Sequence, residues 1–547
     1  MTVSPEVSST PPSNTLSGQR IARSTLMLAV AFAAAKAISL AQTFIIANTF
    51  GVGAEYDAYI TANRAPELIV RLLAGGALGY AFIPVFSGLL AKQDRDGAWR
   101  MASQIANLIF IVALGASILA FFAAPWLVST VYAPGFTPEV QAQTTVMLRI
   151  LLISTLIFTI SSLSTDVLQS HNHFLTPALA PILFDIGILI GVIFFLEPFG
   201  VYGIAWGAVL GAVMHLLIQI PALLHVKARW RPLLSFTDPT VMKVVRLMLP
   251  RVAGLGVLSF NYAILNNLAS RLGEGSVSAF SWGFQLTQIP QTLLGTALSI
   301  VIFPTLAALS EAGEETAKRE VLSGGLKFML ITTIPSAVGL IAVGRPLISI
   351  LEGGAFDASA TTAVYYALLG FSLTIVVQSI LEISTRAFYA DKDTLTPLWA
   401  GIVGAVATAG FAIFFSGVWS VTAGTAIDFG VGGLGLALSV GIAFEIAVLI
   451  MILVRRWQWN LWGAIGATLI KALTASAMMG VAVLAIGAIW GALGLSGQGR
   501  LLTLVQVGVM IGGGVIVFLL MATVLRIQEI WVILQAILRR QAPPIQG

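Results

Sequence analysis

The feature that most constrains this chain is a succession of long apolar segments with little between them. A transmembrane helix needs about 20 mostly apolar residues, and segments of that kind cover most of the sequence. The sequence therefore predicts an all-α membrane protein of about 14 transmembrane helices. The predicted spans lie near residues 24–50, 57–90, 103–127, 141–165, 174–196, 201–225, 244–270, 277–309, 326–350, 358–388, 395–416, 431–454, 461–490 and 502–525.

The small number of charged residues excludes a soluble protein. Only 10% of the 547 residues are charged and 57% are hydrophobic, whereas a soluble domain has about 25% charged residues. The absence of cysteine excludes disulfides, thiolate nucleophiles and Cys-based metal sites. With only four histidines, no metal site is expected.

The basic residues predict the orientation of the spans. If the N-terminus is inside, the inside segments carry twenty lysines and arginines, and the outside segments carry only Arg271, Arg345 and Arg500. Short cytoplasmic loops are enriched in Lys and Arg, so both termini are predicted to be cytoplasmic. The basic run over 227–246 is explained by this rule, and no nucleic-acid partner is expected.

Two parts of the chain resemble each other at a fixed spacing. Pro84 and Pro304, and Phe136 and Phe356, are each 220 residues apart, and the tripeptide LTP recurs at 175–177 and 395–397. GVYGIA at 200–205 matches GVGGLG at 430–435, so about ten residues were inserted before span twelve. Spans 1–6 thus recur as spans 7–12, as two parallel six-helix repeats followed by two C-terminal helices. Transporters built this way place a substrate site between the halves; a duplication that serves only stability is the alternative.

The repeat predicts how the chain is divided. The predicted parts are a disordered cytoplasmic tail at 1–23, a first lobe at 24–226, a second lobe at 227–457, spans 13–14 at 458–526, and a cytoplasmic tail at 527–547. Residues 1–19 are rich in Ser, Thr and Pro, which is a composition too polar to fold on its own.

Charged residues inside the spans indicate a functional site, because they are costly in a bilayer and usually face a cavity. Arg64, Glu67 and Arg71 share one face of span two, and Lys36 lies on span one. An excess of positive charge suits an anionic headgroup such as a diphosphate. The alternative for Arg64 and Glu67 is an internal salt bridge.

Two further glutamates and a set of glycines inside the spans are also candidates for a role in coupling or in structure. Glu382 and Glu445 are candidates either for ion coupling or for structural pairing. The glycines of span six, at four-residue spacing, are expected to allow close helix packing. They are Gly203, Gly207 and Gly211.

Several stretches resemble the MurJ/MviN family of lipid II flippases, within the wider superfamily of multidrug and oligosaccharidyl-lipid exporters. The resemblance runs from about residue 24 to about 525. The matching stretches are FGVGAEYDAY at 50–59, PELIVRLLAGGALGYAFIPVF at 66–86, APWLVSTVYAPGF at 124–136, NHFLTPALAP at 172–181, QIP at 219–221, IPSAV at 334–338 and RAFYADKDTLTP at 386–397.

This resemblance implies a fold, a substrate and a place in the cell. The fold is fourteen helices in two lobes around a cationic cavity. The implied activity is alternating access that carries undecaprenyl-diphosphate-linked peptidoglycan precursor to the outer leaflet of the bacterial inner membrane. It implies no enzymatic activity, no cofactor, coupling to membrane potential or to an ion, and the cell-wall synthesis machinery as a possible partner.

The charged face of span two and the resemblance together give the candidate residues, and of these Asp57 and Arg71 match the family pattern. The diphosphate would be bound by residues on spans one, two and eight, namely Lys36, Gln42, Arg64, Arg71 and Gln285. Asp57 and Glu67 would have structural or gating roles. The family has arginines where Lys36, Gln42, Val70 and Gln285 stand, and acidic residues where Thr43, Gly75 and Phe284 stand.

These departures keep other functions open. A flippase for another polyprenyl-diphosphate-linked oligosaccharide would explain the missing arginines. A transport-inactive relative that acts as a partner protein is a further alternative. A membrane glycosyltransferase or ligase is disfavoured, because the outside loops are short and no two carboxylates are placed for acid–base catalysis.

Overall fold

The computed structural model describes residues 37–422, 426–497, 499–527 and 529, and these are almost entirely helical. Within them the only β pairing is an isolated bridge between Gly353 and Phe356. The first helix covers Ala37–Phe50. The others are α2 (Ala54–Ala62), α3 (Arg64–Leu73), α4 (Gly76–Ala91), α5 (Arg95–Trp126), η1 (Leu127–Tyr132), α6 (Pro138–Ser170), α7 (Leu175–Ile190), η2 (Gly191–Phe195), α8 (Leu196–Phe199), η3 (Gly200–Tyr202), α9 (Gly203–Leu217), α10 (Ile220–His225), α11 (Pro239–Ser270), α12 (Ser276–Pro290), η4 (Gln291–Thr296), α13 (Ala297–Glu311), α14 (Glu315–Ser349), α15 (Ala358–Ala390), α16 (Leu395–Thr422), α17 (Ala426–Trp457), α18 (Leu461–Ala492) and α19 (Arg500–Val524).

The prediction of an all-α membrane protein is confirmed. By length and composition, 11 helical runs of the described residues could cross a membrane. One of them, Leu175–His225, is 51 residues long, but it reverses at Gly200, where φ is +57°. The reversal divides this run into two of the predicted spans. Helix α11 and the helix over Ala37–Phe50 account for two more, so each predicted span has a helical counterpart. The predicted tail at 1–23 lies outside the described residues, as does nearly all of the tail at 527–547.

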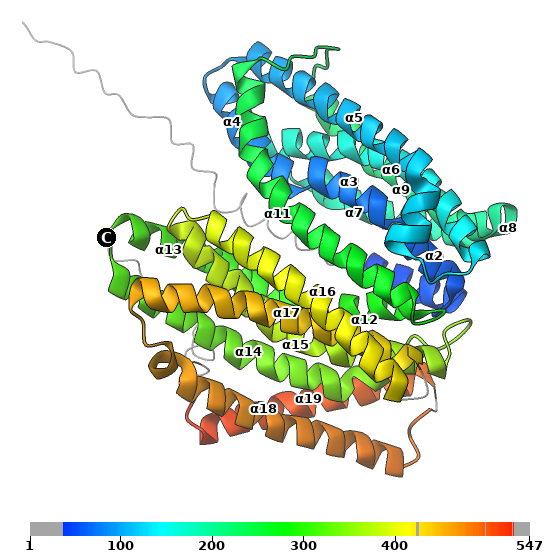
Figure 1. Cartoon of the computed structure of the whole chain (residues 1–547), viewed down its shortest axis with the longest axis vertical. Helices are drawn as coiled ribbons and strands as arrows, with labels where there is room; N and C mark the ends of the chain where they lie inside the picture. The colour runs from blue at the N-terminus through cyan, green and yellow to red at the C-terminus, as the bar shows by residue number, and fades with distance from the viewer. Residues whose placement is uncertain (1–36, 423–425, 498, 528, 530–547) are drawn as a thin grey trace, which may run out of the picture.

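The two repeats form two groups of packed helices (Figure 1). In the first lobe, α6 contacts α2, α3, α4, α5 and α9, and α7 packs against α9. In the second lobe, α15 contacts α12, α13, α14 and α17, and α16 packs against α17. The helices α18 and α19 pack against each other and against α14, on the side of the second lobe away from the first (Figure 1).

Helix α11 links the lobes, because its two halves pack in different places. Near its start, Val241 and Val244 are buried in one cluster with Phe82 and Phe86 of α4. Near its end, Leu265 is buried in the main core, and the helix also contacts α12, α16 and α17. In Figure 1 it runs from beside α4 toward α2 and α12. The helix thus contacts both lobes along its length.

The glycines of span six allow the close packing that the sequence predicts. A Cβ on Gly207 would lie 2.7 Å from the Cα of Gly191, and a Cβ on Gly187 would lie 2.2 Å from the Cα of Gly211. Since real side chains cannot approach backbone so closely, only glycine fits between α7 and α9. The packing interpretation of Gly207 and Gly211 is confirmed.

The second and eighth spans are both irregular at the same depth. α3 ends at Leu73, and α4 restarts after Gly75. In the second repeat α12 passes into the π-helical segment η4, which contains Gly295, 220 residues after Gly75. A Cβ on Gly295 would lie 2.4 Å from the hydroxyl of Ser379. π-Helical segments inside helices frequently occur at functional sites, so the region around these breaks is a candidate site.

Candidate functional site: a polar face between the two lobes

The polar face of span two is formed by α3, which begins at Arg64 and carries apolar residues on its other side. As the spacing predicts, Arg64, Glu67 and Arg71 lie together. Arg71 donates a short hydrogen bond to Glu67, and Arg64 Nη1 lies 3.8 Å from Glu67 Oε2. The predicted internal salt bridge of Arg64 is therefore present, but Glu67 pairs more closely with Arg71. One of the two positive charges is left without a compensating carboxylate on this face.

Arg64 points this face toward the second lobe. Its Nε donates to Asn266 Oδ1 of α11 at 3.0 Å, and its Nη2 donates to the hydroxyl of Ser281 on α12 at 3.5 Å. Asn266 is fully buried and also donates to Thr61 Oγ1 and to the carbonyl of Tyr132. Because these contacts hold Arg64 between the lobes, the face of α3 lies at the interlobe surface and not against lipid.

The later residues of this face remain accessible. The side chains of Glu67 and Arg71 are each 38% exposed, against 18% for Arg64. On α12, the exposed Gln285 follows Ser281 by one turn, so the two residues share a face. The structure thus brings Arg64, Glu67, Arg71 and Gln285 to one surface between the lobes, where a ligand could contact the exposed polar groups.

The structure does not join the two predicted residues of span one to the polar face of α3. Gln42 is half-buried in the helix over Ala37–Phe50 and has no hydrogen bond within the described part of the chain. Lys36 lies outside the described residues. No described contact therefore joins these two positions to the face of α3.

Asp57 joins the lobes at the predicted outer end, which is the end of the bundle where α2 and α12 begin. Its side chain is fully buried. It accepts hydrogen bonds from the backbone N–H groups of Gly275 at 2.8 Å and Ser278 at 2.6 Å, and from the Ser278 hydroxyl. A carboxylate at a helix N-terminus is stabilised by the helix dipole. In return, Glu274 accepts from the N–H of Ala54 at 3.2 Å, so each lobe caps a helix of the other.

Further contacts close the same end. Ala355 donates its N–H to the carbonyl of Asn48 at 2.8 Å. Arg500, at the start of α19, donates to Asn48 Oδ1 at 3.0 Å and to the carbonyl of Glu352 at 2.7 Å. Asn267 of α11 donates to the carbonyl of Val131 at 2.8 Å. The predicted outer end is thus closed by contacts from both lobes and from α19.

Several of these residues were not predicted from the sequence. Asn266 and Ser281 orient Arg64, and Asn48 and Arg500 close the predicted outer end. The only available signal was the occurrence of asparagines at 266–267 inside an apolar span. Uncharged polar residues are common enough in membrane helices that this signal is weak.

The two half-buried glutamates differ in their surroundings. Glu382 Oε1 accepts from Gln291 Nε2 at 2.5 Å and from the hydroxyl of Thr296 at 3.2 Å, both in η4. Its other oxygen is buried without a hydrogen-bond partner. Glu445 faces α16, where a Cβ on Gly404 would lie 3.0 Å from Glu445 Oε2. Neither glutamate has an ion-pair partner among the described residues.

Comparisons with known proteins agree with this architecture. The family model described as lipid II flippase MurJ matches residues 46–502. The lipid II flippase MurJ of Burkholderia cenocepacia is 29% identical over 368 residues, which cover 66% of this chain and 71% of that protein. A probable lipid II flippase MurJ of Vibrio cholerae is 26% identical over 401 residues, which cover 71% of this chain and 76% of that protein.

Solved structures share the fold. A lipid II flippase MurJ in an inward closed conformation aligns with a TM-score of 0.73 and 23% identity, covering 91% of this chain and 98% of that one. An inward-facing multidrug resistance transporter of the MATE family aligns with a TM-score of 0.62 and 17% identity, covering 77% and 94%. Because the family model covers most of the chain, this protein belongs to the lipid II flippase MurJ family.

Proposed function

We propose that this protein moves lipid II, the undecaprenyl-diphosphate-linked peptidoglycan precursor, from the inner to the outer leaflet by alternating access. The observation that carries the proposal is the match to the lipid II flippase family model over residues 46–502. The interlobe position of the cationic face on α3 supports it, since parallel-repeat transporters bind substrate between their halves. The implied partners are the lipid-linked precursor and the bilayer, with the cell-wall synthesis machinery as a further proposed partner.

The proposed headgroup site is the accessible part of that face. Arg71 would bind the diphosphate through its planar guanidinium, and Arg64, Gln285, Gln42 and Lys36 would contribute further contacts. Glu67 would keep Arg71 oriented, because the two side chains are hydrogen-bonded. Asp57 would act as a gate residue that closes the predicted outer end.

A flippase for another polyprenyl-diphosphate-linked oligosaccharide is the second candidate. The observation that favours it is the presence of Gln42, Val70 and Gln285 at positions where the family has arginines. Glutamine can donate and accept neutral hydrogen bonds, which suits a sugar better than it suits a diphosphate. The two candidates share the diphosphate and differ in what it carries.

The orientation and the energy source are also proposals. The positive-inside rule supports a location in the bacterial cytoplasmic membrane with both termini in the cytoplasm. Transport would be coupled to membrane potential or to an ion, with Glu382 and Glu445 as candidate coupling residues. We assign no catalytic role to any residue.

A rescue experiment tests the function. The native lipid II flippase is depleted from a bacterium, this chain is expressed, its membrane insertion is verified, and lipid II on the outer leaflet is measured. Restored exposure of lipid II is expected. If the chain is inserted normally and lipid II stays inside, the lipid II assignment is wrong and the second candidate is tested with its own lipid.

The same assay tests the headgroup site. Arg71→Ala should lower transport more than tenfold, because hydrogen bonds to charged groups are worth about 1.5–3 kcal/mol. Arg149→Ala is the matched control, because Arg149 lies on α6 against the carbonyl and ring of Phe121. Equal transport by both variants at equal membrane levels would rule out a diphosphate contact at Arg71.

A further inference from the structure

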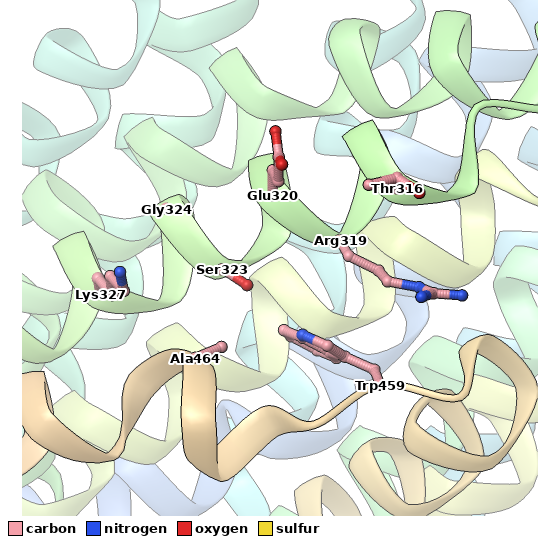
Figure 2. Close-up of a pocket in the computed structure, with 8 residues that line it drawn as sticks. All are labelled: Thr316, Arg319, Glu320, Ser323, Gly324, Lys327, Trp459 and Ala464. Carbon is pink, nitrogen blue, oxygen red and sulfur yellow. The ribbon is translucent and has the colours of Figure 1, made fainter.

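A separate pocket lies at the predicted cytoplasmic end of the second lobe. Its volume is about 440 Å³, and Figure 2 shows its walls formed by the first turns of α14 and by the start of α18. The lining residues are Thr316, Arg319, Glu320, Ser323, Gly324, Lys327, Trp459 and Ala464. None of them belongs to the polar face of α3.

The charges of this pocket favour an anion. Arg319 has no ion-pair partner among the described residues, and its Nε is buried without a hydrogen bond. Lys327 has one distant carboxylate, Glu529 Oε1 at 3.8 Å. In Figure 2, Arg319 extends along the Trp459 side of α14, whereas Glu320 points away from Trp459. The pocket therefore has a guanidinium without an ion-pair partner among the described residues at one end and an ammonium at the other, with the hydroxyl of Ser323 between them (Figure 2).

The internal repeat explains why the protein leaves a pocket here. At the equivalent place in the first lobe, the connector over 226–238 lies against α5. Asn107 donates to the carbonyls of Arg231 at 2.9 Å and Leu233 at 2.8 Å. Ser103 accepts from the N–H of Arg231 at 3.1 Å. The connector that follows the second repeat covers only 458–460, so it is too short to fill the corresponding surface of α14.

The charge of the surface changes along with the connector. In the first repeat Asp96 lies 3.9 Å from Arg229 and 3.9 Å from Arg231, so a basic connector meets an acidic residue. At an offset of 220, Thr316 replaces Asp96, and the other positions become Arg319, Ser323 and Lys327 in place of Trp99, Ser103 and Asn107. Glu320 stands in place of Arg100, so the lining changes from one acid and one base to one acid and two bases.

The depth of the pocket places it among lipid headgroups. A helix of 35 residues, the length of α14, is about 52 Å long at 1.5 Å per residue. This exceeds a hydrocarbon layer of about 30 Å. The apolar span predicted for this helix begins near residue 326, so the excess includes 316–324, and Lys327 lies at its boundary. Trp462, which begins α18 next to the pocket, is 73% exposed, as is typical of tryptophan at the membrane interface.

We propose that this pocket binds the phosphate of an anionic phospholipid from the cytoplasmic leaflet. Arg319 binds the phosphate oxygens, Ser323 donates a hydrogen bond, Lys327 adds positive charge at the other end of the pocket, and Trp459 packs against the glycerol region. Basic pockets between transmembrane helices on the cytoplasmic side bind anionic headgroups in this way. The lipid takes the place that the connector occupies in the first lobe and fills the space between α14 and α18.

Retention of phosphatidylglycerol by the purified full-length protein tests the proposal. The protein is reconstituted in phosphatidylcholine nanodiscs with and without phosphatidylglycerol, and bound lipid is counted by native mass spectrometry. Replacing both cations, Arg319→Gln with Lys327→Gln, should weaken retention about 30-fold, since each basic residue near the surface contributes about 1 kcal/mol. The control is Lys92→Gln with Arg95→Gln, which removes two exposed cations from the same end of the first lobe.

A second variant leaves the charges intact. A Cβ on Gly324 would meet no atom within 4 Å, so Gly324→Leu should fill the pocket without strain and also reduce retention. Equal retention by wild type and both pocket variants would overturn the proposal. If inorganic phosphate in pure phosphatidylcholine discs protects the protein from thermal unfolding as well as phosphatidylglycerol does, the site binds free phosphate and the lipid assignment is wrong.

Discussion

Replacing Asp57 by asparagine tests whether one buried carboxylate holds the predicted outer end closed. Asp57 belongs to the first lobe, and all of its donors belong to the N-terminus of α12 in the second lobe. Asparagine has nearly the same size but no charge, and its amide group presents hydrogen atoms where the N–H group of Gly275 needs an acceptor. The substitution therefore weakens the closed arrangement without removing volume.

The magnitude follows from the contacts. A hydrogen bond to a charged group contributes about 1.5–3 kcal/mol, and an anion at a helix N-terminus adds up to about 2 kcal/mol when partly buried. The amide oxygen of asparagine can keep the two bonds from Ser278 in neutral form, because both go to one carboxylate oxygen, but the bond from Gly275 is lost. We therefore expect the closed state to lose about 3 kcal/mol, which is roughly 100-fold in the equilibrium between closed and open outer ends.

Cysteine accessibility measures this equilibrium. The chain contains no cysteine, so Ala58→Cys, at a fully buried position of α2, provides a single reporter for a membrane-impermeant maleimide. Asp57→Asn should raise the labelling rate roughly 100-fold. Glu55→Gln is the control, because Glu55 is an exposed acid on the same helix. Equal labelling rates for the two variants would refute the argument that Asp57 is the main closure contact.

Three further predictions concern other contacts. Arg500→Gln removes the hydrogen bonds to Asn48 and to the carbonyl of Glu352. It should raise the labelling rate of the same reporter about tenfold, because exposed contacts of this kind contribute about 1–1.5 kcal/mol. An unchanged labelling rate would show that α19 does not hold the outer end closed. Burial raises the pKa of Asp391, but hydrogen bonds from Lys318 and Ser310 outweigh it and keep the pKa below its ordinary value. Since the folded-state pKa is depressed, the ionised Asp391 stabilises the protein above the unfolded pKa of about 4, and this stabilisation is lost as pH falls through the folded pKa. The melting temperature of wild type should therefore fall in acid by an amount that Asp391→Asn does not show. Glu382→Gln should slow proton-driven transport more than tenfold and leave lipid binding unchanged, which transport assays at imposed pH gradients would reveal; unaltered transport would leave Glu382 a structural residue.

The features that depend on local pattern could be predicted from the sequence. Apolar segments long enough to span a bilayer, and the offset of 220 residues between Pro84 and Pro304, gave the helices and the two lobes. The spacing of Arg64, Glu67 and Arg71 placed them on one face. These predictions succeed because lipid allows little besides helices whose backbone groups pair internally, so the helical period determines which residues lie together.

The contacts between the lobes could not be predicted in this way. Arg64 meets Asn266 and Ser281 across 202 and 217 residues of chain, and nothing local in the sequence links these positions. Such contacts depend on how two separately folded lobes are tilted, which differs between conformational states of a transporter. The pocket beside Arg319 likewise depends on the length of a connector, and becomes apparent only when the two repeats are compared in space.

Helix α11 contacts both lobes and must follow the movement of each. Its first turns are buried against α4, and near its end Asn266 and Asn267 donate to carbonyls of the first lobe. Because the helix also contacts α12, α16 and α17 of the second lobe, it must bend or lose some of these contacts when the lobes move apart. Gly254 and Gly256 lie near its middle with open space where side chains would be, and glycines are frequent points of helix bending. A bend of about 10° there would move an end of this helix by about 4 Å, given 1.5 Å per residue over half its length. The stiffness of this helix therefore limits how far the two lobes can move relative to each other.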